Sequence, residues 1–341
     1  MQKPITSQFD LNDLPRHERF AVWKESISVL FEVSLNDKEA AGEFTSQLTT
    51  CHMASILFAN SSSKAQQFQR TRQKIARDGL DHVLVQVYRK GCNVGVCGKT
   101  NLNVRPGDLM FLDLGQTVDT RTDDYDNLTL VIPRQTLEPY CPDPGFLHGQ
   151  VLSGQSVSGH LLRTHIEYLW NNLPTVTMQE VPAIVTGLAT LVSVYFGALP
   201  APEHLPEIQS NKLEAIKDYI SNHLANPDLT PDKLAARFFM SRASLYRLFT
   251  REGGLAAYIR QERLDRALRL LGHPAHKHRY ISDIAASVGF YDDAHFSRLF
   301  HRTFGITPSD ARQTFLMDES LAIMGESGSL DRSYEKWLKY L

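Results

Sequence analysis

The sequence predicts an α+β protein. Its N-terminal part is expected to be a β-sandwich or small barrel with flanking helices and a helical hairpin, and its C-terminal part an all-helical domain with two helix-turn-helix units. Short apolar runs separated by turn residues occupy positions 43–133, which is typical of an antiparallel β domain. Apolar side chains recur at helical spacing from about residue 155, and a stretch that begins at Leu234 is nearly repeated about 50 residues later.

The composition indicates a globular chain of roughly two domains with reduced thiols. Its 341 residues are 42% hydrophobic and 22% charged, which is ordinary for a globular protein. The four cysteines are scattered, which favours a cytoplasmic protein over a secreted disulfide framework. Cys92 and Cys97 have no second pair or histidine at zinc spacing, so we expect no metal. No apolar run follows Met1, so no signal peptide is expected.

The N-terminal part is expected to begin with a helix and to continue as strands. Residues 14–31 place apolar side chains at helical spacing. Residues 83–88 form a β-branched run that is typical of a strand. Turn residues at 105–108 and 122–124 separate further short apolar runs. These runs predict strands at 93–96, 102–104, 109–112 and 128–132.

A helical hairpin is expected at about 155–198, after the β core. The second helix of this hairpin is expected at about 181–198. The first helix is expected to carry one stripe that consists of Leu161, Leu162, His165, Ile166 and Leu169.

The uncharged stretch at 181–200 has about the length of a membrane span. However, it contains Pro182, Gly187 and several hydroxyl side chains, and it lacks the Lys and Arg anchors that usually flank a span. We therefore expect a buried or dimer-forming helix here and no membrane insertion.

Composition and charge also suggest the domain boundaries. Residues 1–200 are assigned to a sensor or dimerisation domain, 201–210 to a linker, 211–316 to a DNA-binding domain and 317–341 to a tail with a short helix. Residues 210–315 carry 16 Lys and Arg against 11 Asp and Glu, a net charge of +5. The remainder carries 20 against 27, a net charge of −7. A basic domain on an acidic body is what phosphate binding requires.

Two caps mark the first helix-turn-helix unit. Thr230 followed by Pro231 is a helix start, and Ser241 is the cap of the next helix. The buried face of that second helix is expected to contain Leu245, Leu248 and Phe249. The residues left for the opposite, DNA-contacting face are Arg242, Ala243, Tyr246, Arg247 and Thr250.

The second unit repeats this plan. Gly289 fits the turn, because a positive φ is cheap only for glycine, and Asp292 or Asp293 caps the following helix. The buried face is expected to contain Phe296, Leu299 and Phe300. The candidates for DNA contact are Asp293, Ala294, His295, Ser297, Arg298, His301 and Arg302.

A long helix is expected at 255–271, between the two units. A stiff connector would hold the two DNA-contacting helices at a fixed separation. A separation of about 34 Å would place them in successive major grooves on one face of the DNA. The histidines at 273–279 lie among basic residues, which favours a loop near phosphates over a metal site.

Residues 212–315 resemble the DNA-binding domain of the AraC/XylS family of bacterial transcription regulators. The matching segments are 234–236, 240–241, 245–249, 258–259, 263–267, 281–285, 288–290, 295–300, 304–308 and 311–312. The resemblance implies base contacts by Ala243, Tyr246 and Arg247 in the first unit, and by Asp293, Ala294, His295 and Arg298 in the second. Ala243 is smaller than the contact residue of some relatives, and Asp293 would repel phosphate, so it would cap the helix or accept from cytosine.

The N-terminal half resembles the AraC-binding-like domain found in one branch of this family. The resemblance lies in residues 105–109, 113, 132–134, 137, 147–149 and 152. It implies a cupin-like sensor with a helical dimerisation region, and it identifies no effector and no effector-binding residue. Arg134 would either bind a carboxylate effector or cap a turn, and the turn is the preferred interpretation.

Together these features predict a cytoplasmic, sequence-specific DNA-binding regulator, an activator that responds to a small molecule such as an aromatic or amine catabolite. Its expected partners are double-stranded promoter DNA, RNA polymerase, the effector and a second copy of the chain. We expect no cofactor and no catalytic residue. Two alternatives are that the N-terminal domain is an effector-independent protein-interaction module, or that it is a cupin-type enzyme fused to a DNA-binding module. His52 and His82 lack further ligands at suitable spacing, which disfavours the enzyme.

Overall fold

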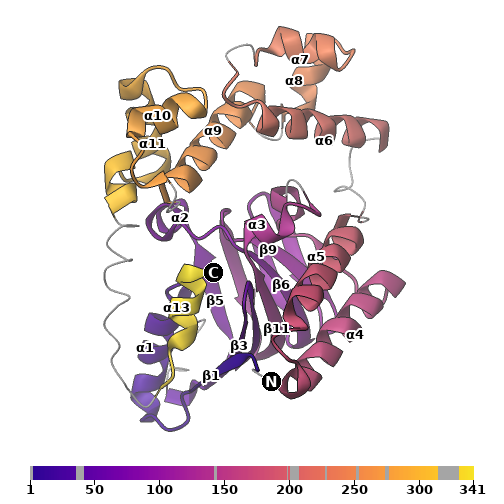
Figure 1. The fold of residues 1–341 in the computed structure, drawn as a ribbon, viewed down its shortest axis with the longest axis vertical. Coiled ribbons are helices and arrows are strands. Elements are labelled where there is room, and N and C mark those ends of the chain that lie inside the picture. Colours follow the sequence, from indigo (N-terminus) through magenta and orange to yellow (C-terminus); the bar gives the residue numbers. More distant parts are fainter. Residues whose placement is uncertain are drawn as a thin grey trace. The chain divides into compact units, whose positions relative to one another are not determined.

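The computed structural model describes residues 3–35, 42–141, 144–197, 199, 207–226, 229–250, 253–272, 276–313 and 330–341. The chain forms two compact units. The first consists of Met1–Ile75, Leu80–Leu199 and Ala322–Leu341, and the second of Ala76–Gly79 and Pro200–Leu321. The predicted fold class is confirmed, because the first unit contains two antiparallel sheets and the second is helical (Figure 1).

Two sheets form the body of the first unit. One has seven strands in the order β1-β3-β4-β11-β6-β9-β12, and the other has five in the order β2-β5-β10-β7-β8. The described pairings are antiparallel. The strands are β1 Ile5–Asp10, β2 Glu32–Ser34, β3 Ser46–Met53, β4 Ile56–Ser63, β5 Gln66–Arg70, β6 Val83–Lys90, β7 Asn93–Cys97, β8 Thr100–Val104, β9 Leu109–Asp113, β10 Val118–Thr122, β11 Tyr125–Ile132 and β12 Val151–Leu152.

Helices accompany these sheets on both sides. They are α1 Arg16–Ile27, α2 Arg72–Asp78, α3 Arg134–Leu137, α4 Val157–Asn172, α5 Val181–Gly197 and α13 Ser333–Tyr340, with 3-10 turns at Pro144–Leu147 and Leu173–Thr175. α4 and α5 cover one face of the seven-stranded sheet, where Phe58 and Val85 belong to the same core as Leu188 (Figure 1). The other face shares a second core with the five-stranded sheet, α1 and α13. Burial on both faces explains why β6 has an almost unbroken apolar sequence.

The sheets extend beyond the range of 43–133 expected for the β core. β1 and β2 precede it, β12 follows it, and α2 interrupts it. β1 escaped prediction because its two fully buried positions are Ser7 and Phe9, so the alternating pattern has only one apolar member.

The stripe expected on the first hairpin helix is only partly buried. Leu161 is 50% exposed and His165 is also exposed, whereas the other three predicted residues are buried. Leu161 shares a second, exposed stripe with Val157 and Tyr168, which are 78% and 70% exposed. Because α4 has apolar residues at helical spacing on two faces, spacing alone does not select the buried one. Among the described residues, no helix is long and apolar enough to cross a membrane.

The second unit contains two short helix pairs joined by a long helix. Its helices are α6 Glu207–Asn222, α7 Pro231–Arg237, α8 Arg242–Leu248, α9 Leu255–Gly272, α10 Ile281–Ser287 and α11 Asp293–Phe304. α9 runs between the pair α7–α8 and the pair α10–α11 (Figure 1). The predicted caps are present, because Thr230, Ser241 and Asp292 each accept a hydrogen bond from a backbone N–H in the first turn of the helix that follows.

Parts of the expected linker, basic loop and tail lie outside the described residues. For the linker these are residues 201–206, and α6 already begins at Glu207, so the last positions assigned to the linker are helical. For the basic loop they are residues 273–275, and for the tail residues 317–329.

Candidate nucleic-acid interface and interior cavity

The first helix-turn-helix unit has one buried and one exposed face on α8. Leu245 and Leu248 are buried in a core that also contains Leu234 of α7 and Ile259 of α9. This core fixes the orientation of α8. The residues expected to contact DNA are all exposed, and they are Arg242, Ala243, Tyr246, Arg247 and Thr250.

Three of these side chains make contacts within the unit. Arg242 Nη1 lies 3.1 Å from Asp232 Oδ1, and Arg247 Nη2 donates to Ser244 Oγ at 3.2 Å. Such exposed contacts are weak, so both guanidinium groups can exchange them for phosphate or base contacts. Thr250 lies beyond the end of α8, and its hydroxyl donates to the backbone oxygen of Tyr246 at 3.3 Å. Its hydroxyl proton is therefore already used.

α11 is divided in the same way. Phe296, Phe300 and Phe304 form a buried ladder with ring centroids 5.5 and 4.6 Å apart. The opposite face exposes Ala294, His295, Ser297, Arg298, His301 and Arg302. Asp292, rather than Asp293, caps the helix, and the hydrogen bond from the His295 N–H lowers the pKa of Asp292. Asp293 is exposed in the first turn of α11, where its negative charge interacts favourably with the positive end of the helix dipole.

The two turns differ at the position that requires a positive φ. The position is occupied by Phe239 with φ of +50° in the first turn, and by Gly289 with φ of +92° in the second. A left-handed conformation costs a non-glycine residue about 1–2 kcal/mol, so the first turn is strained. Phe239 is also 93% exposed. A Cβ at Gly289 would lie 2.4 Å from the backbone oxygen of Leu224, so glycine is required there.

Two hydrogen bonds connect the second helix-turn-helix unit and α9 to the end of the α6 segment. The Tyr291 hydroxyl donates to the backbone oxygen of Ala225 at 2.8 Å, and Arg263 Nε of α9 donates to that of Leu224 at 3.0 Å. Together with α9, these bonds restrict the separation of α8 and α11. The local sequence pattern gave no sign of this role for Tyr291, because its partner lies 66 residues away.

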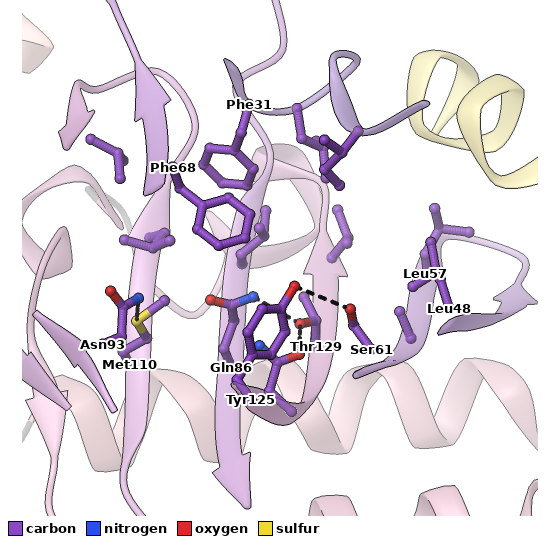
Figure 2. Close-up of a pocket in the computed structure, with 18 of the residues that line it drawn as sticks. Phe31, Leu48, Leu57, Ser61, Phe68, Gln86, Asn93, Met110, Tyr125 and Thr129 are labelled. Atoms are coloured by element: carbon purple, nitrogen blue, oxygen red, sulfur yellow. Dashed lines mark hydrogen bonds between the residues drawn. The ribbon is translucent and has the colours of Figure 1, made fainter. Parts of the chain in front are cut away.

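The first unit contains an interior cavity of about 80 Å³ between the two sheets (Figure 2). The strand register aligns the side chains of the seven-stranded sheet in rows across the cavity floor. The first row is apolar, and the next two contain polar side chains. The rows are Leu57, Val131, Leu84 and Leu112, then Thr50, Ala59, Thr129, Gln86 and Met110, then Leu48, Ser61, Asn127 and Tyr88.

The polar side chains of the cavity are partly bonded to one another. Gln86 Nε2 donates to Thr129 Oγ1 at 2.9 Å, and the hydroxyl groups of Tyr125 and Ser61 lie 3.4 Å apart (Figure 2). Asn93 of β7 donates through Nδ2 to the hydroxyl oxygen of Tyr88 at 3.0 Å. These bonds fix the orientation of the polar groups before anything binds.

Two buried polar atoms of the cavity lining have no hydrogen-bond partner within the described ranges. They are Thr50 Oγ1 and Asn93 Oδ1. Both residues are only 2% exposed. An unpaired buried polar atom costs about 1–3 kcal/mol, so a molecule that pairs with it gains that energy on binding.

Within the part of the chain that the structure describes, no charged side chain lines the cavity. Burial raises the pKa of Tyr125 to about 12 and also raises the pKa of Tyr88, so both phenols are neutral at pH 7. Aromatic rings of Trp23, Phe31 and Phe68 form further parts of the wall. The cavity therefore combines aromatic surface with neutral hydrogen-bonding groups.

The C-terminal helix α13 forms one wall of this cavity through Tyr334 and Leu338. Both side chains are buried in the core between the sheets. The backbone oxygen of Leu338 accepts from His82 Nε2 at 2.9 Å, and the Tyr334 hydroxyl lies 2.5 Å from Ser26 Oγ of α1. α13 is therefore part of the first unit.

Several residues that carry the N-terminal resemblance meet at a buried ion pair that is not part of the cavity lining. Asp113 Oδ2 lies 2.6 Å from Arg134 Nη2, and the Asp113 N–H donates to His148 Nδ1 at 3.0 Å. Burial opposes the charge of Asp113, but the Arg134 guanidinium outweighs it and lowers the pKa of Asp113 to about 2. Burial lowers the pKa of His148. Arg134 also lies 3.4 Å from Asp81, so its positive charge is paired with two carboxylates of the same unit.

The four cysteines are free thiols, and burial raises the pKa of Cys97 to about 12 and that of Cys51 to about 11. Such thiols are unreactive at neutral pH. Among the described residues, no group of three or more His, Cys, Asp or Glu side chains is arranged to hold a metal ion.

Two domain families match the chain. Residues 26–194 match the AraC-binding-like domain, and residues 234–314 match a helix-turn-helix domain. The two matches correspond to the unit with the cavity and to the unit with α7–α8 and α10–α11.

Individual proteins are similar to parts of the chain. It is 34% identical over 109 residues to the HTH-type transcriptional activator RhaS of Shigella boydii and 33% identical over 109 residues to RhaS of Escherichia coli. These matches cover 31% of this chain and only 38% of either relative. The crystal structure of the AraC-like transcriptional activator CuxR is similar with a TM-score of 0.54 and 26% identity, over 84% of this chain and 100% of that one.

Proposed function

Because the chain belongs to the AraC family, with an AraC-binding-like domain ahead of a helix-turn-helix domain, we propose that it binds promoter DNA sequence-specifically and regulates transcription. The observation that carries this proposal is the pair of exposed faces on α8 and α11, joined by α9. Each face offers arginine beside smaller or aromatic side chains, which suits contacts to phosphates and base edges in the major groove. The site of action would be the cytoplasm, where the DNA lies.

We assign DNA contact to Arg242, Ala243, Tyr246 and Arg247 on α8, and to Ala294, His295, Ser297, Arg298, His301 and Arg302 on α11. Thr250 stays in the proposed set as a phosphate contact, for which its hydroxyl would exchange the backbone oxygen of Tyr246 for a phosphate oxygen, because phosphate only accepts hydrogen bonds. The two faces differ in sequence, so each chain would recognise a directional half-site with two unequal parts. The names of RhaS and CuxR, both transcriptional activators, support activation through RNA polymerase as the mode of regulation.

Selection of fragments from the organism's own genome on the immobilised full-length chain would test DNA recognition. The recovered fragment and a shuffled version of the same composition are then compared by fluorescence anisotropy over a range of salt concentrations. We expect both affinities to fall steeply with salt, because phosphate contacts release counterions, and the recovered fragment to stay at least 10³-fold tighter. Equal affinities at every salt concentration would reject the proposal.

We propose that the first unit binds a small-molecule effector in its cavity, which the unpaired atoms of Thr50 and Asn93 support. The alternative, an interaction module without effector, predicts that no small molecule raises the melting temperature of the chain. A ligand that binds only the folded state does raise it. A thermal-shift measurement with a metabolite library therefore distinguishes the two.

We propose that two copies of the chain associate through the exposed stripe of Val157, Leu161 and Tyr168 on α4. A stripe of large apolar side chains on one helix face is typical of a protein–protein contact. Light scattering after size-exclusion chromatography would give the mass of a dimer for the wild type and of a monomer for Leu161→Asp. An unchanged mass in the variant would remove this face from the interface.

A further inference from the structure

We infer that the cavity of the first unit binds a small, uncharged ring compound that carries a hydroxyl or similar hydrogen-bonding group. This inference rests on the proposed effector function and specifies its ligand. It follows from the lack of charge, the aromatic walls, the unpaired polar atoms and the volume.

The lining selects against charged molecules. A buried ion without a partner costs several kcal/mol, and the described lining offers no side chain of opposite charge to offset this cost. Arg70 is also buried in this unit, but its guanidinium donates to the backbone oxygens of Leu114, Leu30 and Leu80. Arg134 is paired with Asp113. Neither arginine is therefore available to a carboxylate in the cavity.

The unpaired atoms define the polar group of the ligand. Asn93 Nδ2 already donates to Tyr88, which leaves Asn93 Oδ1 as an acceptor that requires a donor. Thr50 Oγ1 can donate and accept. A hydroxyl group satisfies either atom, because it also donates and accepts. An ether or a hydrocarbon has no proton to offer Asn93.

The walls and the volume define the rest of the ligand. Trp23, Phe31 and Phe68 favour a flat ring, because aromatic faces and edges attract one another. A volume of about 80 Å³ has room for about five to eight water molecules at 10–15 Å³ each. The ligand therefore has about five to eight non-hydrogen atoms, which corresponds to a single ring with one small substituent.

Phenol, benzoate, benzylamine and anisole form a matched set of probes for the full-length chain at pH 7. They share one ring and are respectively a neutral donor, an anion, a cation and a neutral compound without a donor. Benzoate has nine non-hydrogen atoms, so benzamide, which is neutral and has the same number, controls for its size. Calorimetric titration should detect phenol binding and at least tenfold weaker binding of the other three. Asn93→Leu keeps the branched shape with a somewhat larger side chain, removes the acceptor together with the donor to Tyr88, and should weaken phenol binding at least about three- to tenfold, the value of one neutral hydrogen bond. Thr50→Val is a second, isosteric variant that is expected to act in the same direction.

The inference is overturned if benzoate or benzylamine binds as tightly as phenol, if both variants bind phenol as the wild type does, or if the wild type binds none of the probes. Binding of the selected genomic fragment is measured on the same samples without any probe. Loss of that DNA binding would contradict the proposed regulator, whereas normal DNA binding without phenol binding would contradict only the ligand assignment.

A separate set of contacts leads us to infer that α13 closes the cavity over its ligand. Arg332, just before α13, lies 3.0 Å from Glu25 of α1 and 2.5 Å from Glu335. The Ser7 hydroxyl of β1 donates to the backbone oxygen of Asp331 at 3.0 Å. These polar contacts hold α13 in place without forming part of the cavity wall, which α13 supplies through Tyr334 and Leu338.

Arg332→Ala tests this closing role, because it removes the contacts with Glu25 and Glu335 and leaves the cavity lining unchanged. If only the seated form of α13 binds ligand, the apparent affinity falls in proportion to the seated fraction, and we expect phenol binding to weaken two- to tenfold. Lys336→Ala on an exposed position of α13 is the matched control and should bind as the wild type does. Unchanged or tighter phenol binding by Arg332→Ala, or absence of phenol binding in the wild type, overturns the closing role.

Discussion

Replacement of Arg134 by methionine should strongly destabilise the first unit. Methionine keeps much of the length and apolar surface of arginine but removes the charge that faces Asp113 at 2.6 Å. The side chains of Asp113 and Arg134 are 4% and 11% exposed, so water replaces little of the lost contact. Asp113 would keep the Gly115 N–H at 2.8 Å and Gln116 Nε2 at 3.1 Å as hydrogen-bond donors.

The free energy of unfolding should fall by about 3–5 kcal/mol at pH 7, the range for removal of one partner from a buried ion pair. The double variant Arg134→Met with Asp113→Asn should recover most of it, because no unpaired charge remains in the core. If Arg134 instead served a carboxylate effector, the single variant would have nearly normal stability and would lose only its response to effector.

The loss of stability in Arg134→Met should become smaller as the pH falls. In the wild type the folded-state pKa of Asp113 is about 2, below its value in the unfolded chain, so this carboxylate stabilises the fold above pH 4 and stops doing so as the pH falls toward 2. In the variant, burial without Arg134 raises the folded-state pKa, so protonation relieves the penalty as the pH falls. The difference between the two proteins is therefore largest at neutral pH and narrows toward pH 4.

Urea unfolding followed by tryptophan fluorescence measures this effect for the first unit alone. The chain has three tryptophans, Trp23, Trp170 and Trp337, and all three lie in the first unit. A lower midpoint at an unchanged slope reports a change in stability. A variant within about 1 kcal/mol of the wild type at pH 7 would refute the assignment of Arg134 to a stabilising ion pair, since it falls well below the 3–5 kcal/mol range.

Three further predictions concern the second unit. Arg298→Ala should weaken binding to the selected fragment by about 1–3 kcal/mol, measured by anisotropy, and an unchanged affinity would exclude Arg298 from base contact. Gly289→Ala should lower the helical unfolding midpoint followed by circular dichroism, because its Cβ would lie 2.4 Å from Leu224 O at a φ of +92°, whereas Phe239→Gly in the strained first turn should be tolerated. Tyr291→Phe removes the hydrogen bond to the backbone oxygen of Ala225. It should weaken binding to the complete fragment more than binding to a shortened fragment that offers only one major-groove site. An equal loss of affinity for both fragments would contradict the role of Tyr291 in spacing α8 and α11.

The helix-turn-helix units could be predicted because their signals are local. A capping residue and an apolar spacing of three or four residues are both contained in one or two helical turns. Ser241, Asp292 and the buried faces of α8 and α11 follow this rule. The choice between Asp292 and Asp293 needed the structure, because either carboxylate could reach a free N–H of the first turn.

The cavity could not be predicted, because it depends on pairing between distant strands. Gln86 and Thr129 are 43 residues apart, and only the register of β6 with β11 makes them neighbours. The local signal that remains is a polar residue inside an otherwise apolar strand, as at Gln86. The contact between Ser26 and Tyr334 spans 308 residues, so α13 could be expected as a helix but not as a cavity wall.

The order of the chain gives α13 a second consequence for regulation. Residues 200–321 belong to the DNA-binding unit, and residues of the first unit flank them on both sides. When α13 is seated, the second unit is therefore attached to the first unit at both of its ends, which would restrict it more than one linker would. A ligand that favours the seated α13 would act on DNA binding through this second attachment. Cleavage at a protease site inserted after Ser329 should leave the affinity for the selected fragment without phenol unchanged and abolish any effect of phenol on it. An effect of phenol that survives cleavage would exclude α13 as the route of the signal.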